Sequence, residues 1–351
     1  MSLAERNLTR DEIVGWLREE SAERLEELFA AADGVRQARV GEEVHLRGLV
    51  ELSNYCRRQC GYCGIRAGNG AVERYRMTAE EVLACADKAQ AFRYGTLVIQ
   101  AGEDPGLEAG WVADLVRRIK TQTRLAVTLS LGERADEELR LWRDAGADRY
   151  LLRFETSDRA LFDRIHPPAP GQSVSDRIAQ LGALRRLGYE VGSGVMIGIP
   201  GQSFESLADD LGLFRELDLD MIGVGPFIEH PATPLGSGGE RLAPGAQVPN
   251  TEAMTYKVVA LARLLRPDAN IPSTTALATL NKKSGRELGL SRGANVVMPN
   301  LTPVRHRAKY EIYPGKACIN ETAEACAGCL EARIRSMGRK VGVGQGGRRK
   351  V

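Results

Sequence analysis

The sequence has few histidines, few aromatic residues and no long apolar run. Its 351 residues include four histidines, and phenylalanine, tryptophan and tyrosine together make up 5%. No stretch approaches the roughly 18–20 apolar residues of a membrane-spanning helix, and the first residues lack the apolar core of a secretion signal. Charges nearly balance, with a net charge of +2, which gives no electrostatic basis for binding nucleic acid. We therefore expect a cytoplasmic protein with neither a membrane nor a nucleic acid as partner.

The cysteines are the most informative residue type in this composition, because they are grouped. The seven cysteines cannot all pair, and their grouping is wrong for a secreted disulfide framework. Three of them, Cys56, Cys60 and Cys63, lie within eight residues. Fully ligated iron–sulfur clusters normally take four cysteines, so three predict a cluster with one iron open to a substrate or cofactor. Zinc is the alternative, although zinc sites usually add further Cys or His ligands, and no histidine lies near this loop.

A second set of three cysteines lies near the end of the sequence. The spacing of Cys318, Cys326 and Cys329 suits an iron–sulfur centre or zinc. The alternative is a group of reduced cysteines that binds nothing. We expect the seventh cysteine, Cys85, to pack in the core, because free cysteine is among the most buried residue types.

Apolar, β-branched runs alternate with amphipathic segments along most of the chain. This alternation indicates parallel βαβ units in an α/β protein, and eight such runs in about 250 residues suit a closed (β/α)8 barrel of the TIM type. We expect a helical extension at 1–43, the barrel at 44–303, a cysteine-containing extension with barrel-capping tyrosines at 304–351, and a frayed basic tail at 346–350. The predicted strands are 44–52, 96–100, 124–130, 149–153, 190–197, 221–224, 270–274 and 295–298.

Polar motifs follow these predicted strands. The cysteine triplet follows the first strand, Gln100-Ala-Gly-Glu103 the second and Arg153-Phe-Glu155 the fourth. Because the reactive groups of a parallel barrel gather at the carboxyl ends of its strands, we expect these motifs to form one site.

The cysteine triplet, with Tyr62 before its last cysteine, resembles the CxxxCxxC loop of radical S-adenosylmethionine (SAM) enzymes. In that family the loop holds a 4Fe–4S cluster that binds SAM at its open iron. Phrases such as LRGLVELSNYCRRQCGYCGIR, QAGED, VGSGVMIGIPGQ and NIPSTTALAT are similar to the HydE family, the maturases of FeFe-hydrogenase. They cover most of residues 46–303, and the segment YEIYPGK before Cys318 strengthens the match. Biotin synthase and methylornithine synthase are sister families with the same barrel.

The resemblance implies a role for each matching position. Cys56, Cys60 and Cys63 would be the catalytic cluster ligands, and Cys318, Cys326 and Cys329 would hold an auxiliary 2Fe–2S or 4Fe–4S cluster. Many relatives have serine at Ala101 and histidine at Phe154, so two polar side chains near the SAM shell are absent here. The implied SAM shell consists of Tyr62, Gln100, Gly102, Glu103, Ser130, Arg153, Glu155, Arg177, Gly198, Phe227 and Ile228. The implied substrate shell consists of Thr128, Arg149, Thr274, Thr275, Met298, Tyr310 and Tyr313.

The resemblance also implies a reaction. The reduced cluster would cleave SAM, and the adenosyl radical would act on a small iron–cysteine–carbonyl–cyanide precursor during assembly of the two-iron subcluster of FeFe-hydrogenase. The protein would contact other maturation proteins and an electron donor transiently. One alternative is another radical SAM enzyme, of the biotin synthase or methylornithine synthase group, that acts on a small amino acid. The other is a non-catalytic iron–sulfur carrier.

Overall fold

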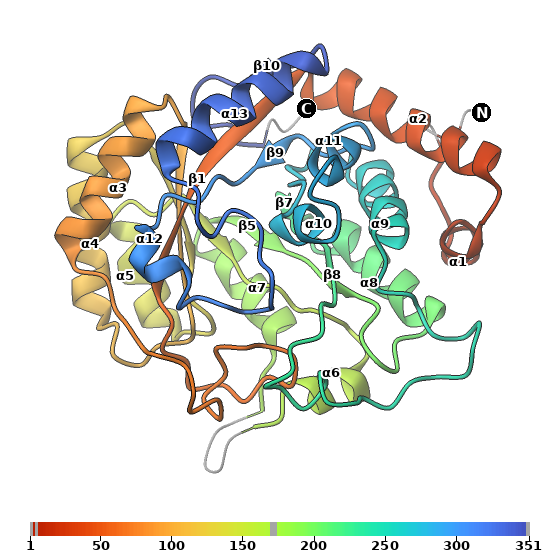
Figure 1. Ribbon diagram of the computed structural model, residues 1–351, viewed down its shortest axis with the longest axis horizontal. Coiled ribbons are helices and arrows are strands. Elements are labelled where there is room, and N and C mark those ends of the chain that lie inside the picture. Colours follow the sequence, from red (N-terminus) through yellow and green to blue (C-terminus); the bar gives the residue numbers. More distant parts are fainter. Residues whose placement is uncertain (1–2, 4–5, 169–173, 349–351) are drawn as a thin grey trace.

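The computed structural model describes residue 3, residues 6–168 and residues 174–348, and its strands form a closed parallel barrel (Figure 1). In barrel order, β1 (Glu43–Ser53), β2 (Thr96–Ala101), β3 (Ala126–Ser130), β4 (Arg149–Leu151), β5 (Glu190–Ser193) and β7 (Met221–Ile222) are hydrogen-bonded neighbours. Bridges from Met221 to Asn270 and from Pro272 to Val296 continue the ring. Pairing of β9 (Val296–Val297) with β1 then closes it. The predicted eight-stranded barrel is confirmed.

Three short strands extend this ring. Above β5 and β7, β6 (Met196–Ile197) pairs with β8 (Gly225–Pro226). At the other end, β10 (Lys340–Val341) pairs with the first residues of β1. The helices are α1 (Arg10–Arg18), α2 (Ala22–Val40), α3 (Ala79–Ala91), α4 (Ala109–Gln122), α5 (Asp136–Asp144), α6 (Arg159–Ile165), α7 (Arg177–Arg186), α8 (Phe204–Glu216), α9 (Glu252–Leu265), α10 (Thr275–Leu280), α11 (Gly285–Leu290), α12 (Val304–Arg307) and α13 (Ala323–Ser336).

Local sequence signals explain where the helices begin. Thr78 starts α3 with a capping box, in which its hydroxyl accepts from the Glu81 amide and the Glu81 carboxylate accepts from the Thr78 amide. The apolar face of α3 packs against the barrel, and Cys85, 3% exposed, lies in that core as expected. No helix in the described ranges is long and apolar enough to cross a membrane.

The two faces of each strand differ in chemistry. Leu97 and Ile99 of β2 point outward and join the large apolar core under the helices, whereas Thr96 and Gln100 on the other face point into the barrel. Because the strands are parallel, their amino ends form one end of the barrel, the floor, and their carboxyl ends form the other, the mouth. In Figure 1 the loop that follows β1 lies at the lower edge, and β10 lies toward the upper edge.

The prediction of a frayed tail at 346–350 is wrong for residues 346–348, and residues 349 and 350 lie outside the described residues. The backbone of the tail runs under the barrel floor, where the Gly346 carbonyl accepts from Arg47 at 2.9 Å and the Gln345 carbonyl accepts from Thr96 at 2.9 Å. The Arg348 guanidinium, 8% exposed, binds Asp220 at 2.9 Å and Asp268 at 2.7 Å. Charge pairing and backbone hydrogen bonds therefore hold residues 345–348 against the floor.

Candidate active site

The cysteine triplet lies on the long loop between β1 and α3, at the barrel mouth. Backbone hydrogen bonds fix this loop to three separate parts of the chain. The Arg57 amide donates to the Glu103 carbonyl at 3.0 Å, the Gly61 amide to Ile165 at 2.8 Å, and the Gly64 amide to Ile312 at 2.9 Å. The loop is therefore held by the end of β2, the end of α6 and the C-terminal extension.

The three thiols lie in a poorly hydrated setting. Burial raises the pKa of Cys60 to about 12, and the nearby Cys56 thiol also acts to raise it. Burial likewise raises the pKa of Cys63 and of Cys56. These thiols remain protonated near neutral pH unless they bind a metal centre, which requires the thiolate and releases the proton.

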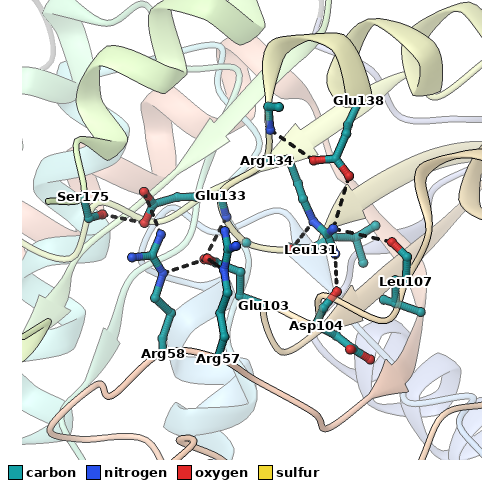
Figure 2. Close-up of polar contacts among 12 residues, drawn as sticks. Arg57, Arg58, Glu103, Asp104, Leu107, Leu131, Glu133, Arg134, Glu138 and Ser175 are labelled. Carbon is teal, nitrogen blue, oxygen red and sulfur yellow. Dashed lines mark hydrogen bonds and ion pairs between the residues drawn. The ribbon is translucent and has the colours of Figure 1, made fainter. Parts of the chain in front are cut away.

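The carboxylate of Glu103 fixes the cysteine loop from the side, as Figure 2 shows. It accepts from Arg57 Nε and from Arg58 Nε, each at 2.7 Å, and from the Glu133 amide at 3.0 Å. Burial acts to raise the pKa of Glu103, but the bonds from Arg58, Glu133 and Arg57 lower it overall. Glu103 was predicted to contact SAM. Its carboxylate instead binds Arg57 and Arg58, the two arginines between Cys56 and Cys60.

A line of alternating charges continues from Arg58 across the barrel mouth, and Figure 2 shows its first two members, Arg58 and Glu133. Arg58 pairs with Glu133 at 3.2 Å, and Glu133 in turn accepts from Arg177 Nε at 3.0 Å. Arg177 also donates to the Arg153 carbonyl at 2.8 Å, and Arg153 pairs with Glu155 at 3.0 Å. The structure thus brings Arg153, Glu155 and Arg177 together. Sequence reasoning missed Arg58 and Glu133, although Glu133 lies three residues after the end of the third strand.

Glycines allow close backbone approach at two predicted positions. A Cβ on Gly102 would lie 2.1 Å from the Tyr55 carbonyl oxygen and 2.9 Å from Cys56 Cβ, so this residue lets the QAGE segment touch the cysteine loop. Gly198 has a φ of +77°, and a Cβ there would lie 2.4 Å from the backbone of Asn250. Glycine is the residue type that tolerates both constraints.

A small apolar cluster lies beside the cysteine loop. It contains Leu161, Ile165, Met196, Ile199, Phe227 and Leu235, and Tyr62 packs against it. Two predicted SAM-shell residues, Tyr62 and Phe227, therefore meet here. Ile228 follows Phe227 and is half-buried, and so is Ser130 at the end of β3. Phe154 instead faces the outer core against Phe214, with ring centroids 6.1 Å apart.

Most of the predicted substrate shell also lies toward the mouth. Gln100 Nε2 donates to the Tyr310 hydroxyl at 3.2 Å, which joins the two predicted shells. Burial raises the pKa of Tyr313, against a hydrogen bond with Thr279. Thr128 is buried in β3, and its hydroxyl has no partner among the described residues. Thr274 caps α10, Thr275 is the first residue of that helix, and Met298 follows β9.

Arg149 does not join this group. It is the first residue of β4, so it lies at the floor, where its guanidinium donates to Glu190 at 2.6 Å, to Thr96 at 3.0 Å and to the Gln345 carbonyl at 3.1 Å. Its hydrogen bonds hold the tail and the strand ends at the floor. We therefore remove Arg149 from the substrate shell.

The second cysteine set borders a cavity of about 340 Å³ that is lined by the C-terminal extension and by residues within 278–286. Cys318, Cys326 and Cys329 line it together with the basic side chains Lys282, Arg286, Lys316 and Arg333. Arg286 donates to Cys318 Sγ at 3.3 Å. The buried Arg307 donates to the Cys318 carbonyl at 3.2 Å and so fixes this segment to the barrel.

Comparison with known proteins decides the family. Residues 50–214 match the model of the Radical SAM superfamily. The chain is 46% identical over 326 residues to the [FeFe] hydrogenase maturase subunit HydE of Thermotoga maritima, across 93% of this chain and 90% of that protein. The chain belongs to the HydE family of radical SAM enzymes. It is 28% identical to the 3-methylornithine synthase of Methanosarcina acetivorans, across 87% of this chain and 83% of that one.

Solved structures share the fold of this chain. The crystal structure of methylornithine synthase (PylB) superposes with a TM-score of 0.81 at 26% identity, over 97% of this chain and 96% of that one. HydG, a maturase of the [FeFe]-hydrogenase, superposes with a TM-score of 0.76 at 20% identity, over 96% of this chain and 73% of that one. The second likeness shows the shared fold.

Membership in this enzyme family implies a 4Fe–4S cluster and SAM, and the residues present fit both groups. Three thiols on one loop are soft ligands suited to iron–sulfur chemistry. In the described ranges, no three or more His, Cys, Asp or Glu side chains converge closely enough to hold a single metal ion, whereas a cluster presents several irons to its thiolates. Arg153 Nε and Thr128 Oγ1 are buried polar atoms without partners in the described structure, which suits a site that receives a polar ligand.

Proposed function

We propose that this enzyme is a radical SAM maturase that acts on a small iron complex during assembly of the two-iron subcluster of FeFe-hydrogenase. The observation that carries the proposal is the cysteine triplet, fixed at the barrel mouth by Glu103 in a chain 46% identical to a HydE protein. The substrate would be an iron complex with cysteine, carbonyl and cyanide ligands. Contacts with other maturation proteins and with an electron donor, in the cytoplasm, belong to the same proposal.

Each part of the mouth then has a task. Cys56, Cys60 and Cys63 would hold the cluster, which when bound supplies the electron for reductive cleavage of SAM. Because Glu103 is engaged with Arg57 and Arg58, it would hold the loop rather than contact SAM directly. Fixing the loop in advance reduces the cost of ordering it during the reaction.

The remaining SAM shell divides by chemistry. Arg153, Glu155 and Arg177, joined by ion pairs and hydrogen bonds, would orient the polar groups of SAM. The aromatic and apolar surface of Tyr62, Phe227 and Ile228 would receive the adenine. Gly102 would support the site by letting the QAGE segment contact the cysteine loop, and Gly198 by letting its segment contact Asn250. Gln100 and Ser130 would border the cofactor.

The substrate would lie deeper in the barrel. Thr128, Thr274, Thr275, Met298, Tyr310 and Tyr313 would line its site. Hydroxyl groups suit an anionic ligand because they donate hydrogen bonds to it, and the buried Thr128 hydroxyl without a described partner supports this assignment. The link from Gln100 to Tyr310 would place the substrate next to SAM.

We further propose that Cys318, Cys326 and Cys329 hold a second iron–sulfur cluster, either 2Fe–2S or 4Fe–4S. Lys282 and Arg286, which line the same cavity, support this because their positive charge would offset that of thiolates and cluster, and Arg286 already donates to Cys318. We also retain a division into an N-terminal helical extension (1–43), the barrel (44–303) and a C-terminal extension (304–351).

The central test is SAM turnover. Anaerobically reconstituted protein reduced with dithionite should consume SAM and release 5′-deoxyadenosine. Cys60→Ala should abolish this turnover, whereas Cys85→Ala, at a core cysteine, should retain it. Turnover by a variant lacking all three loop cysteines would refute the proposal, and transfer of iron without 5′-deoxyadenosine would indicate a carrier. Cells lacking the gene should make hydrogenase without its two-iron unit.

A further inference from the structure

A buried histidine contacts the aromatic residue of the cysteine loop. His166 directly follows α6, and its Nε2 lies 3.0 Å from the Tyr62 hydroxyl, 104 residues away in sequence. The two rings meet edge to face, with centroids 5.4 Å apart and planes 87° apart. This hydrogen bond therefore fixes both the position and the tilt of the Tyr62 ring.

The imidazole is itself held in place by α6. Its ring lies 4.3 Å from the Phe162 ring, centroid to centroid, and its backbone amide donates to the Phe162 carbonyl at 2.8 Å. His166 is 7% exposed. An apolar side chain would fill this position with less desolvation cost, and within the described ranges the only side-chain hydrogen bond of His166 is the one to Tyr62.

Backbone contacts reinforce the same end of the loop. The Ile165 carbonyl accepts from the Gly61 amide at 2.8 Å, and the Gly61 carbonyl accepts from the Leu235 amide at 2.9 Å. The end of α6 thus contacts Gly61 through the backbone and Tyr62 through a side chain. Glu103 acts on the opposite end of the loop, at Arg57 and Arg58.

We propose that His166 is a positioning residue that orients Tyr62 for SAM. The bond to Tyr62 keeps the ring against the apolar cluster that contains Met196 and Phe227, so that the aromatic surface is in place before SAM binds. This inference rests on the proposed function, because it requires SAM to bind beside Tyr62. Preorganising one aromatic ring strengthens binding because less side-chain freedom is lost when the ligand arrives.

A double-mutant cycle tests the inference. The proteins are wild type, His166→Phe, Tyr62→Phe and the double variant, each with its cluster reconstituted and its iron content measured. The readout is SAM affinity, from titration of the electron paramagnetic resonance signal of the reduced cluster. Each single substitution should weaken SAM binding by about three- to tenfold, the size of one hydrogen bond. The double variant should bind no more weakly than either single, and iron content should be unchanged.

Two further proteins complete the test. Tyr189→Phe removes another buried phenol, which donates to the Leu139 carbonyl at 2.6 Å away from the mouth, and SAM affinity should not change. His166→Gln, which keeps a hydrogen-bonding group, should recover part of the affinity. Losses that multiply in the double variant, or unchanged affinity in Tyr62→Phe, would overturn the inference, and Tyr62→Phe gives this answer even if His166→Phe fails to fold. If wild type binds no SAM, the proposed function itself fails.

Discussion

The Lys316 ammonium pairs with the Glu51 carboxylate across 265 residues of sequence, and the two side chains are only 5% and 1% exposed. Glu51 belongs to β1, and Lys316 borders the cavity of the second cysteine set. Asn300 donates to the other Glu51 oxygen at 3.0 Å. This buried pair therefore connects the first barrel strand to the C-terminal extension.

Removing one partner of this pair should be costly. Lys316→Met would leave the Glu51 carboxylate buried without its counter-ion, which we expect to lower the free energy of unfolding by about 3–5 kcal/mol. Adding Glu51→Gln should restore much of that loss. Urea unfolding of the cluster-free protein measures both. Lys309→Met, which breaks a pair whose partners are 30% and 73% exposed, should change stability by less than about 1 kcal/mol. An equally small loss in Lys316→Met would contradict the prediction.

A methyl group at Gly102 should displace the cysteine loop. Gly102→Ala would place a Cβ 2.1 Å from the Tyr55 carbonyl oxygen, so we expect weaker cluster retention and at least about tenfold slower SAM cleavage, since small misplacements cost this much. Gly110→Ala is the matched control, because its Cβ would meet nothing within 4 Å inside α4. It should gain about 0.5–1 kcal/mol in unfolding free energy, as alanine favours helices. Both variants are compared by their iron content and by the amount of 5′-deoxyadenosine that they form. Equal values for Gly102→Ala and Gly110→Ala would contradict the steric argument.

Asp210 should make stability depend on pH. Burial raises its pKa from 3.8 to about 7, although bonds from Ser157 oppose the shift. A raised carboxyl pKa means that the folded state holds its proton more tightly than the unfolded state. Stability therefore falls as pH rises from about 4 to about 7 and then levels off, with a total loss on the order of 4 kcal/mol.

Asp210→Asn removes this titration. The variant should be more stable than wild type at pH 8, and the difference should shrink as the pH falls toward 4. Urea unfolding at several pH values measures it. Asp209→Asn is the control. The Asp209 side chain pairs with Arg10, each is 50% exposed, and the substitution should not change how stability depends on pH. A parallel profile for wild type and Asp210→Asn would show that Asp210 ionises normally.

The tail should depend on Arg348. Arg348→Met removes the cation that binds Asp220 and Asp268, so amide hydrogens in residues 342–348 should exchange faster with solvent. We expect a loss of about 2 kcal/mol in unfolding free energy, because the pair is partly buried. Arg335→Met, at a side chain that is 71% exposed, should change neither quantity. Unchanged exchange in Arg348→Met would mean that the backbone contacts alone hold the tail.

The sequence was sufficient for the barrel and the cysteine loop because their signals are local. Each buried strand is a short apolar run, and the triplet stands directly after the first. The predicted seventh strand makes only bridges at Asn270 and Pro272, which fits proline's missing amide donor. Two arginines lie between the first two cysteines, yet only the structure identifies Glu103 as their shared partner.

Position along a strand and long-range pairing were harder to infer. Arg149 has the inward-facing register of a site residue, but it begins its strand and therefore lies at the floor. Arg348 looked like a solvated terminal charge because its partners Asp220 and Asp268 lie 128 and 80 residues away. Nothing in the local pattern of a basic tail reveals such partners.

The tail beneath the barrel floor also has a consequence for the order of folding. One edge of β1 pairs with β9 and β10, and Arg47 bonds to Gly346 across 299 residues. During synthesis that strand edge therefore stays open until residues 296–346 have emerged, and contacts of such sequence separation form slowly. We therefore expect the ring to close only after most of the chain has left the ribosome. The barrel that supports the cysteine loop is then complete only late in synthesis, and stable incorporation of iron should follow its closure.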